Sequence, residues 1–414
     1  MNIKEMVQRK TKILATLGPS SSTIKKIIQL SKAGANAFRL NCSHLDEKDL
    51  VDYIKKIRRA EELLKKPIGI LVDLQGPKIR IGPIDEEENL LTKGDIFILD
   101  SYKDLGNNKR VFLPHKKIFS SVKKGQLILL DDGKIHLEVI NVKATQIKTK
   151  VLQGGLLRSN KGINLPQTAL RTSALSSIDK KFANLAVDEG VDWIALSFVQ
   201  KPSDIKDLKK ICTNKVSIMA KIEKPSALNY IDEIADLVDG IMIARGDLGV
   251  ELPIESVPGW QKKIIRVARM KGKPVVVSTQ MLESMTSSLI PTRAEVSDVA
   301  NAVFEGADAV MLSAESASGN YPVETVQMMN KIALNIENDD NYNSILSRQL
   351  EQTPDTTPDA IATAAKTLAD ELSSPIIVCY TESGSTGIKV SRVRPSQTIL
   401  TITPVIETAR KLSL

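Results

Sequence analysis

The 414-residue chain is poor in cysteine, histidine and aromatic residues, and each scarcity argues against a class of protein. Its three cysteines, Cys42, Cys212 and Cys379, lie far apart without a Cys-x-x-Cys pair, so neither a disulfide framework nor a thiolate zinc site is indicated. We expect them to be small buried hydrophobic residues. Aromatic residues make up 4% of the chain and form no stacking platform, so we expect no nucleic-acid partner despite the formal net charge of +8.

The sequence also lacks any apolar run long enough to cross a bilayer, and it has no charged-then-apolar leader at its start. Hydrophobic residues account for 42% of the chain, which is enough for a sizeable core. We therefore expect a cytoplasmic globular protein of roughly two to four domains, with no membrane partner.

One arrangement recurs along the chain: a helical pattern, often a glycine, and then an apolar run that ends on a polar residue. Glycine suits the left-handed end of a helix, and a nearly unbroken apolar run suits a parallel strand that is covered on both faces. The eight runs are KILATLG, ANAFRLN, IGILVDLQG, VDWIALS, VSIMAKIE, GIMIAR, PVVVST and ADAVMLS. They predict an α/β fold with a (β/α)8 TIM barrel, which we assign to residues 1–78 and 166–338.

Two further regions have a different pattern. Residues 79–165 carry short strands joined by Asp-Gly and Lys-Gly turns, and they predict a small β-barrel inserted as a lid in a βα loop above the catalytic face. Residues 339–414 begin with a polar, proline-punctuated linker that includes a helix, and then predict a C-terminal α/β domain with elements at 359–372, 375–380, 386–392 and 398–403. Two strands form a thin sheet with exposed edges, so we expect this domain to be incomplete or truncated.

Lys221 and Glu223 stand two residues apart in SIMAKIEK, so their side chains point to the same side of a strand. Such a pair is usually solvated surface decoration. In a barrel, however, the carboxyl ends of all the strands meet at one mouth. The other ends bring further polar residues there, namely Arg39, Asn41, Ser43, Asp73, Ser197, Arg245, Asp247, Thr279 and Ser313. This convergence favours an active site over unrelated surface residues.

The residue types at this mouth indicate phosphate chemistry. Glu223 and Asp247 follow adjacent strands, and two carboxylates suit a Mg²⁺ ion that keeps positions free for substrate oxygens. Arg39, Arg245 and Lys221 could face a phosphate, although an arginine in a strand-end loop could equally pair with a carboxylate.

Histidine chemistry is not indicated. The three histidines, His44, His115 and His136, show neither metal-ligand spacing nor a Ser-His-Asp arrangement. A metal and cations without a histidine base are what phosphoryl transfer needs, because that reaction depends on positioning and charge neutralisation. No Walker-type phosphate loop is present, so a nucleotide would be held differently.

In their order along the chain, these motifs resemble those of the pyruvate kinase family. They run from Thr11 to about Glu324 as TKILATLGPSS, RLNCSH, DLQGPKIRIG, DDG, NKGINLP, IMAKIEKPSAL, IMIARGDLGVE, STQMLESM, PTRAEVSDVANAVFEGADAVMLSAES and YPVE. The resemblance implies transfer of the phosphoryl group of phosphoenolpyruvate to ADP, giving ATP and pyruvate in the last step of glycolysis. It also implies a homotetramer as the oligomeric state.

The resemblance further implies a role for individual residues. Glu223 and Asp247 would bind Mg²⁺ or Mn²⁺, Lys221 would offset the charge on the phosphoryl group in flight, and Arg39 would anchor the phosphate. Substrate contacts would come from Gly246, Asp247 and Thr279, and nucleotide contacts from Asn41, His44, Arg80, Asp132 and Lys161. The hydroxyls of Thr279 and Ser313 are candidates for enolate protonation, and both could instead be capping groups.

Lys78 in GPKIR departs from the family members that have glutamate at this position and use K⁺. The ion's positions elsewhere are matched here by Asn41, Ser43, Asp73 and Leu74. Exchanging glutamate for lysine changes the local charge by about +2, more than one monovalent ion contributes. We therefore expect that the Lys78 ammonium replaces the ion and that K⁺ is not required.

Three further points stay open at this stage. Thr381 to Thr386 resemble the family's anion effector loop and could equally be a helix-capping turn. A Mg²⁺-dependent lyase or mutase acting on pyruvate-like enolates would share a barrel and paired carboxylates. An inactive truncated homologue would bind Mg²⁺ and phosphoenolpyruvate without turnover.

Overall fold

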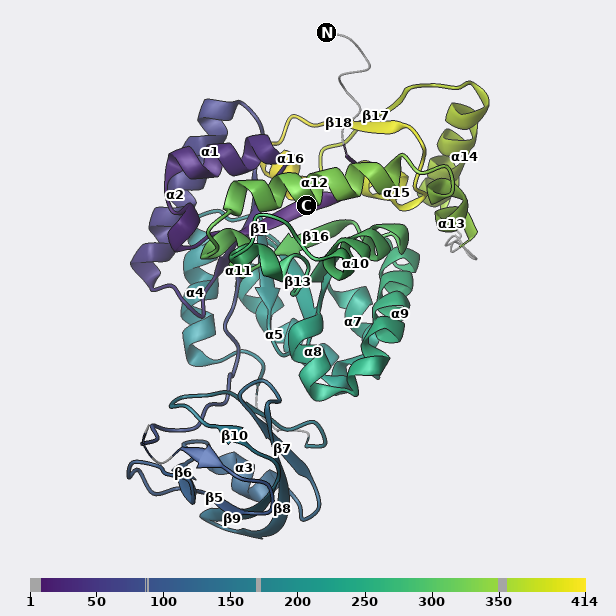
Figure 1. The fold of residues 1–414 in the computed structure, drawn as a ribbon. Coiled ribbons are helices and arrows are strands. Elements are labelled where there is room, and N and C mark those ends of the chain that lie inside the picture. The colour runs from purple at the N-terminus through teal and green to yellow at the C-terminus, as the bar shows by residue number, and fades with distance from the viewer. Residues whose placement is uncertain (1–8, 86, 88, 169–172, 349–355) are drawn as a thin grey trace.

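The computed structural model describes residues 9–85, 87, 89–168, 173–348 and 356–414. Eight parallel strands close into a barrel in the body of the molecule (Figure 1). Around the ring they are β1 (Lys12–Thr16), β16 (Ala309–Leu312), β15 (Val275–Ser278), β14 (Gly240–Ala244), β13 (Ser217–Ile222), β12 (Trp193–Leu196), β3 (Gly69–Asp73) and β2 (Ala37–Asn41). All eight lie within the apolar runs of the sequence, so the predicted TIM barrel is confirmed.

The strands are apolar on both faces because each face is buried. Alternate residues point into the barrel, where Trp193, Met219, Met242 and Met311 pack together. The remaining strand residues face a larger outer core that the helices cover. This double burial explains why the strand sequences do not alternate between apolar and polar residues.

Helices connect the strands around the outside of the barrel. Those that pack on the outside of the barrel are α1 (Ile24–Ala33), α2 (Glu47–Leu64), α4 (Ser177–Asp188), α5 (Pro202–Cys212), α7 (Ile231–Leu237), α9 (Val257–Met270), α10 (Arg293–Phe304) and α12 (Pro322–Glu337). Short helices follow three strand ends: α6 (Pro225–Leu228), α8 (Arg245–Glu251) and α11 (Ala314–Ala317). Helix α1 is capped at both ends, since Thr23 accepts a hydrogen bond from the Lys26 amide and Gly34 ends the helix with φ of 131°.

A separate β unit is inserted between β3 and α4, as predicted, and lies at the lower end of the molecule in Figure 1. Its mixed six-stranded sheet has the order β11 (Ile163–Asn164), β7 (Leu127–Leu130), β8 (Ile135–Lys143), β9 (Gln146–Gln153), β5 (Ile96–Asp100) and β6 (Arg110–Phe112). Beside it, β4 (Leu90–Leu91) pairs with β10 (Gly155–Leu156), and α3 (Lys116–Ser121) follows β6. The unit has its own core, which includes Phe97 and Leu137. We call it the lid.

The C-terminal part of the chain lies at the other end of the barrel (Figure 1). It contains α13 (Tyr342–Arg348), α14 (Thr357–Glu371), β17 (Ile376–Tyr380), α15 (Ser385–Arg392), β18 (Thr398–Ile402) and α16 (Ile406–Lys411). β17 and β18 pair in parallel, which confirms the two predicted strands, whereas α16 was not predicted. Residues 349–355 of the expected linker lie outside the described residues.

Contacts of α16 show which end of the barrel this part covers. Trp193 at the start of β12 donates its indole N–H to the Lys411 carbonyl at 3.2 Å, and Arg410 forms an ion pair with Glu61 of α2 at 2.6 Å. These contacts lie at the amino ends of the strands. The carboxyl ends, which carry the polar residues singled out above, therefore face the lid.

Two expectations about composition can be compared with the described residues. Cys42, Cys212 and Cys379 are all buried and unpaired, as expected for small hydrophobic residues. Within the described ranges, no helix combines the length and the apolar character that a membrane span needs.

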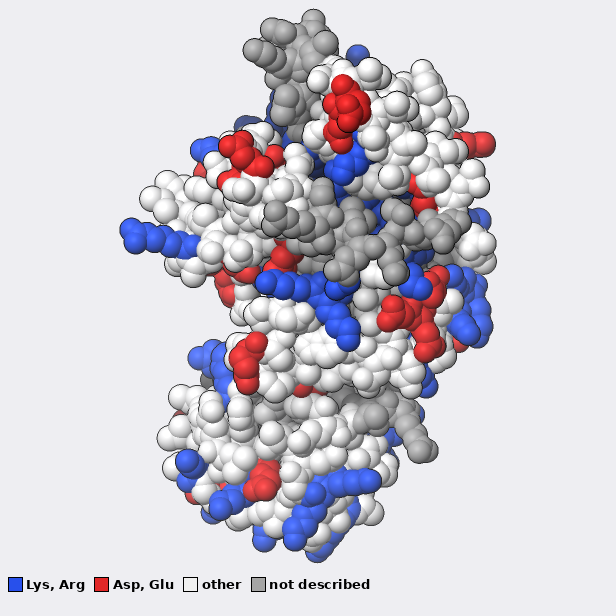
Figure 2. Space-filling model, turned by 90° about the vertical axis from the view of Figure 1, so that its right-hand side faces the viewer, with Lys and Arg blue, Asp and Glu red and all other residues white. Residues whose placement is uncertain are grey.

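On the described part of the face in Figure 2, Lys and Arg side chains are interspersed with Asp and Glu, on the lid as well as on the barrel.

Candidate active site

Lys221 lies at the carboxyl end of β13 in a cage of polar groups from three strands. Its Nζ is 2.8 Å from Glu223 Oε1 and 3.1 Å from Asp73 Oδ1, and it donates a hydrogen bond of 2.7 Å to Ser197 Oγ. Burial works against the charged ammonium, but the Asp73 and Glu223 carboxylates outweigh it and raise the pKa of Lys221. Lys221 is therefore a fixed, permanently charged cation at the barrel mouth.

Asp73 at the end of β3 is fully buried and holds two cations at once. Besides Lys221, it binds Arg39, whose Nε donates to Asp73 Oδ2 at 2.7 Å and whose second nitrogen lies 2.6 Å from the same oxygen. Burial alone would raise the pKa of Asp73, but Lys221 and Arg39 together hold it below its ordinary value. Arg39 also donates to Thr16 Oγ1 at 3.1 Å, so β1, β2 and β3 together orient the guanidinium.

Glu223 is bound by both of its carboxylate oxygens. Lys221 takes Oε1, and the backbone N–H of Phe198 donates to Oε2 at 2.8 Å. Burial raises the pKa of Glu223, and the nearby carboxylate of Asp247 adds to this effect while Lys221 opposes it. The sequence had suggested that Lys221 and Glu223 do not pair as surface decoration. They do form an ion pair, but it is buried at the strand ends.

Asp247 lies in the first turn of α8, the short helix that begins directly after β14. Gly246 precedes it and donates its backbone N–H to Thr279 Oγ1 at 2.8 Å. Thr279 in turn donates its hydroxyl to the Ser278 carbonyl at 2.6 Å and has a left-handed φ of 71°, which is unusual for a β-branched residue. The Thr279 hydroxyl thus caps the start of α8.

Arg245 does not point to a free position at the mouth. Its guanidinium pairs with Asp298 of α10 at 2.6 Å and donates to the Thr279 carbonyl at 2.7 Å. Of the two alternatives that the sequence left open for Arg245, the structure shows the carboxylate pair. Its evident role is to hold the loop that carries Thr279.

The expected nucleotide-contacting residues lie on both sides of the gap between barrel and lid. His44 lies in the loop after β2, and burial together with the charges of Arg39, Arg80 and Lys78 lowers its pKa. On the lid, Lys161 pairs with Asp131 at 2.7 Å, next to exposed Asp132. Arg80 donates to the Asn160 carbonyl at 3.0 Å.

Four further residues singled out in the sequence lie at the ends of β2, β3 and β16. The Ser43 amide donates to Asn41 Oδ1 at 3.2 Å, which closes a tight turn. Ser313 is the N-cap residue of α11 and donates its amide to Glu315 Oε2 at 2.7 Å. Leu74, which follows Asp73, is buried.

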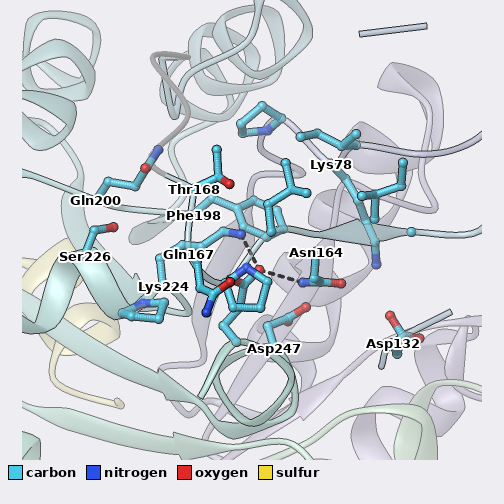
Figure 3. A pocket seen from close by; sticks show the side chains of 18 residues that line it. Lys78, Asp132, Asn164, Gln167, Thr168, Phe198, Gln200, Lys224, Ser226 and Asp247 are labelled. Atoms are coloured by element: carbon cyan, nitrogen blue, oxygen red, sulfur yellow. Dashed lines mark hydrogen bonds and ion pairs between the residues drawn. The ribbon is translucent and has the colours of Figure 1, made fainter. Parts of the chain in front are cut away.

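A cavity of about 250 Å³ lies between lid and barrel beside this cluster (Figure 3). Its wall includes Lys78, Asp132, Phe198, Lys224 and Asp247. The lid therefore covers the side of the mouth on which the expected metal ligand Asp247 lies.

Sequence reasoning missed four groups in this region. The Phe198 backbone N–H carries no sequence signal. Lys224, Glu251 and Asn164 form a network in which Asn164 donates to Glu251 at 2.8 Å and Lys224 pairs with Glu251. The spacing of Asp247 and Glu251, four apart on one helix face, could have pointed to Glu251.

The chemistry of the carboxylates at the mouth shows whether they could bind a metal ion. Among the described residues, no group of three or more His, Cys, Asp or Glu side chains is placed to hold a metal ion. Glu223 and Asp247 are nevertheless close enough to influence each other electrostatically. Two hard carboxylates fit Mg²⁺, which is usually bound by one or two protein carboxylates and takes its other oxygens from substrate and water.

Comparisons with known proteins agree with this geometry. The chain matches the family models for the pyruvate kinase barrel domain over residues 8–326 and the pyruvate kinase alpha/beta domain over residues 359–414. It is 51% identical to a pyruvate kinase of Methylorubrum extorquens over 98% of this chain and 85% of that protein, and 47% identical to one of Agrobacterium vitis over 98% and 86%. A crystal structure of a pyruvate kinase from Cryptosporidium parvum superposes with a TM-score of 0.94 at 34% identity, covering 99% of this chain and 86% of the other.

Proposed function

The chain belongs to the pyruvate kinase family, and from this premise we propose which residues transfer the phosphoryl group of phosphoenolpyruvate to ADP. The observation that carries the proposal is the position of Lys221, a buried ammonium fixed by Asp73, Glu223 and Ser197 at the mouth of the barrel. A charge held in place stabilises a transition state without first having to reorganise.

Lys221 and Arg39 are the proposed phosphate-binding cations. Lys221 offsets the negative charge on the phosphoryl group as it moves, which a compact ammonium can do from one side. Arg39 anchors the phosphate, because its planar guanidinium can bind two oxygens at once. Both side chains form ion pairs with Asp73, which keeps them at a fixed separation.

Glu223 and Asp247 would hold the divalent cation that the family uses, and we propose Mg²⁺, with Mn²⁺ as a substitute. A bound divalent cation supplies positive charge that neutralises phosphate and enolate oxygens. The chain's own contribution is to hold Glu223 beside Lys221 and to orient it through the Phe198 amide.

The start of α8 is the proposed site for the carboxylate end of phosphoenolpyruvate. The backbone N–H groups of Gly246 and Asp247 would bind it there, beside the Thr279 hydroxyl that accepts the Gly246 N–H in the structure. A Cβ at Gly246 would lie 3.4 Å from Thr279 Oγ1, so glycine leaves the space beside this hydroxyl open. We propose that Thr279 and Ser313 pass a proton to the enolate through water and hydroxyl groups.

ADP is proposed to lie between lid and barrel. Asn41 and His44 would contact it from the barrel side, and Arg80, Asp132 and Lys161 from the lid. Lid closure would exclude water from the phosphates, which strengthens every charge interaction inside the site. Lys78 is proposed to replace K⁺, so that Asn41, Ser43, Asp73 and Leu74 need not bind a monovalent ion.

Three coarser features belong to the same proposal. We propose that residues 1–78 and 166–338 form the catalytic barrel domain, 79–165 the lid domain and 339–414 the C-terminal domain. A homo-oligomer, tetrameric as is usual in the family, is proposed as the working form. We also propose a cytoplasmic location, where glycolysis takes place.

A coupled assay for ATP formation from phosphoenolpyruvate and ADP tests this function. We expect ATP in proportion to pyruvate, and only when a divalent cation is present. Pyruvate-like products without ATP would instead support a lyase or mutase. Binding of Mg²⁺ and phosphoenolpyruvate without turnover would support an inactive homologue.

A further inference from the structure

Glu251, the last residue of α8, lies at the centre of a buried contact between lid and barrel. Its side chain is 1% exposed and forms an ion pair with Lys224, while Asn164 donates its side-chain amide to the same oxygen, Oε1, at 2.8 Å. Dashed lines in Figure 3 mark these two contacts at the cavity. The other oxygen, Oε2, is buried and has no hydrogen-bond partner among the residues described.

Each partner of Glu251 belongs to a different part of the proposed site. Lys224 directly follows Glu223, so fixing its side chain also restrains the turn that carries this proposed metal ligand. Glu251 itself stands four residues after Asp247, on the same face of α8, and both line the cavity. Asn164 lies on β11, where the chain returns from the lid to the barrel.

The lid contacts helix α8 at a second point. The lid turn at Asp131, Asp132 and Gly133 has positive φ at all three residues, and a Cβ built on Gly133 would lie 3.5 Å from Val250 of α8. Non-glycine residues adopt this backbone conformation at a cost that surrounding structure must offset. The lid therefore meets α8 both at this turn and at Asn164.

Stability alone does not account for an ionic network at this position. A buried ion pair is often no more stabilising than apolar residues of the same volume, and here one carboxylate oxygen also lacks a hydrogen bond. A buried carboxylate with this cost is better explained by what it holds in place.

We propose that Glu251 is a positioning residue for both metal ligands. It fixes Glu223 through Lys224, and it fixes Asp247 through helix α8. Its contact with Asn164 connects this arrangement to the lid. The inference rests on the proposed function, because it takes Glu223 and Asp247 as the metal ligands. Glu251 acts through these residues, and no contact with substrate is required of it.

Isothermal titration calorimetry of the whole protein with Mn²⁺, in the absence of substrates, tests the proposal. We expect Glu251→Gln to weaken Mn²⁺ binding about tenfold, as is usual when a group that orients a metal ligand is removed. Exposed Glu255, which lies just after α8, provides the matched control, and Glu255→Gln should bind Mn²⁺ as the wild type does.

The charge-balanced variant Lys224→Met/Glu251→Gln separates positioning from simple electrostatics. If Glu251 acted only by its charge, Lys224→Met would bind Mn²⁺ more tightly and the double variant would match the wild type. Positioning predicts weaker binding in both variants. If the network served stability alone, the variants would melt at lower temperature with an unchanged Mn²⁺ affinity, and this result would overturn the proposal.

Asn164→Leu tests the lid connection and remains informative if the Glu251 variants fail to fold. We expect the KM for ADP to rise several-fold, and the Ile163 amide, which donates to the Ile79 carbonyl at 2.9 Å, to exchange its hydrogen faster. An unchanged KM and unchanged exchange would contradict the connection. A wild type that makes no ATP would refute the proposed function, whereas an active wild type with unaffected variants would refute only this inference.

Discussion

The ammonium of Lys221 lies 3.1 Å from the carboxylate of Asp73, although their strands, β13 and β3, are not neighbours in the barrel. β12 runs between them, and Ser197 just beyond its end accepts a hydrogen bond of 2.7 Å from Lys221. The cation is thus held across three strands. Asp73 also binds Arg39, so it positions both of the cations that are proposed to bind the phosphate.

Asp73 should make stability depend on pH in the acid range. The pKa of Asp73 is lower in the folded protein than in the unfolded chain, so the unfolded chain takes up this proton first as the pH falls. The stabilising contribution of Asp73 is complete above the unfolded pKa, and it is lost as the pH falls through the folded pKa. We expect Asp73→Asn to be less stable at pH 7 and to lose less stability between about pH 5 and about pH 3. Urea unfolding at several pH values measures this, with exposed Asp232→Asn as control. Equal slopes in wild type and Asp73→Asn would contradict the assignment.

Glu223 and Asp247 should each be needed for the divalent cation. We expect Glu223→Gln and Asp247→Asn to weaken Mn²⁺ binding at least about tenfold, since even groups that only orient a metal ligand commonly have an effect of this size. Electron paramagnetic resonance of free Mn²⁺ gives the affinity without relying on activity. If either variant bound Mn²⁺ as tightly as the wild type, that residue would not be a ligand.

Lys78 should remove the need for K⁺. We expect full activity in a tetraalkylammonium buffer free of K⁺ and Na⁺, and we expect Lys78→Glu to become K⁺-dependent, because the exchange restores an anion that a monovalent ion can balance. Initial rates across a K⁺ titration measure both. Strong activation of the wild type by K⁺ would refute this assignment.

His44 should titrate below its ordinary range because burial and three nearby cations disfavour its charged form. Lys78→Met removes one of these cations, so the pKa of His44 should rise in that variant. Burial alone lowers the pKa of His115 in the lid, which makes it an internal control that should not respond. With only three histidines in the chain, proton NMR can follow each one. An unchanged pKa of His44 in Lys78→Met would contradict the influence of the Lys78 charge on this histidine.

The barrel was predictable because its strands are buried on both faces, which leaves long apolar runs that end on polar residues. The lid strands at Leu90–Leu91 and Gly155–Leu156 were missed, since two-residue strands carry no periodicity. Helix α16 was also missed, because its position depends on contacts with Glu61 and Trp193 that are remote in sequence.

The site could be predicted where the barrel's geometry imposes convergence, as for Lys221, Glu223 and Asp247. It could not be predicted where a residue has several possible partners that are distant in sequence. Arg245 could have faced a phosphate, and only the fold shows Asp298 beside it. The Phe198 amide and the Asn164 contact depend on backbone and lid positions that no residue pattern encodes.

The rate of ATP formation by Lys221→Met, compared with that of Lys215→Met, tests the central claim most directly. Both lysines belong to the segment around β13, but Lys215 is exposed before its amino end, whereas Lys221 lies at the mouth. If Lys221 stabilises the phosphoryl group in flight, kcat should fall about 10³-fold or more in Lys221→Met, with Mn²⁺ binding retained, and should stay at the wild-type level in Lys215→Met. A folded Lys221→Met protein with near-normal kcat would contradict the account.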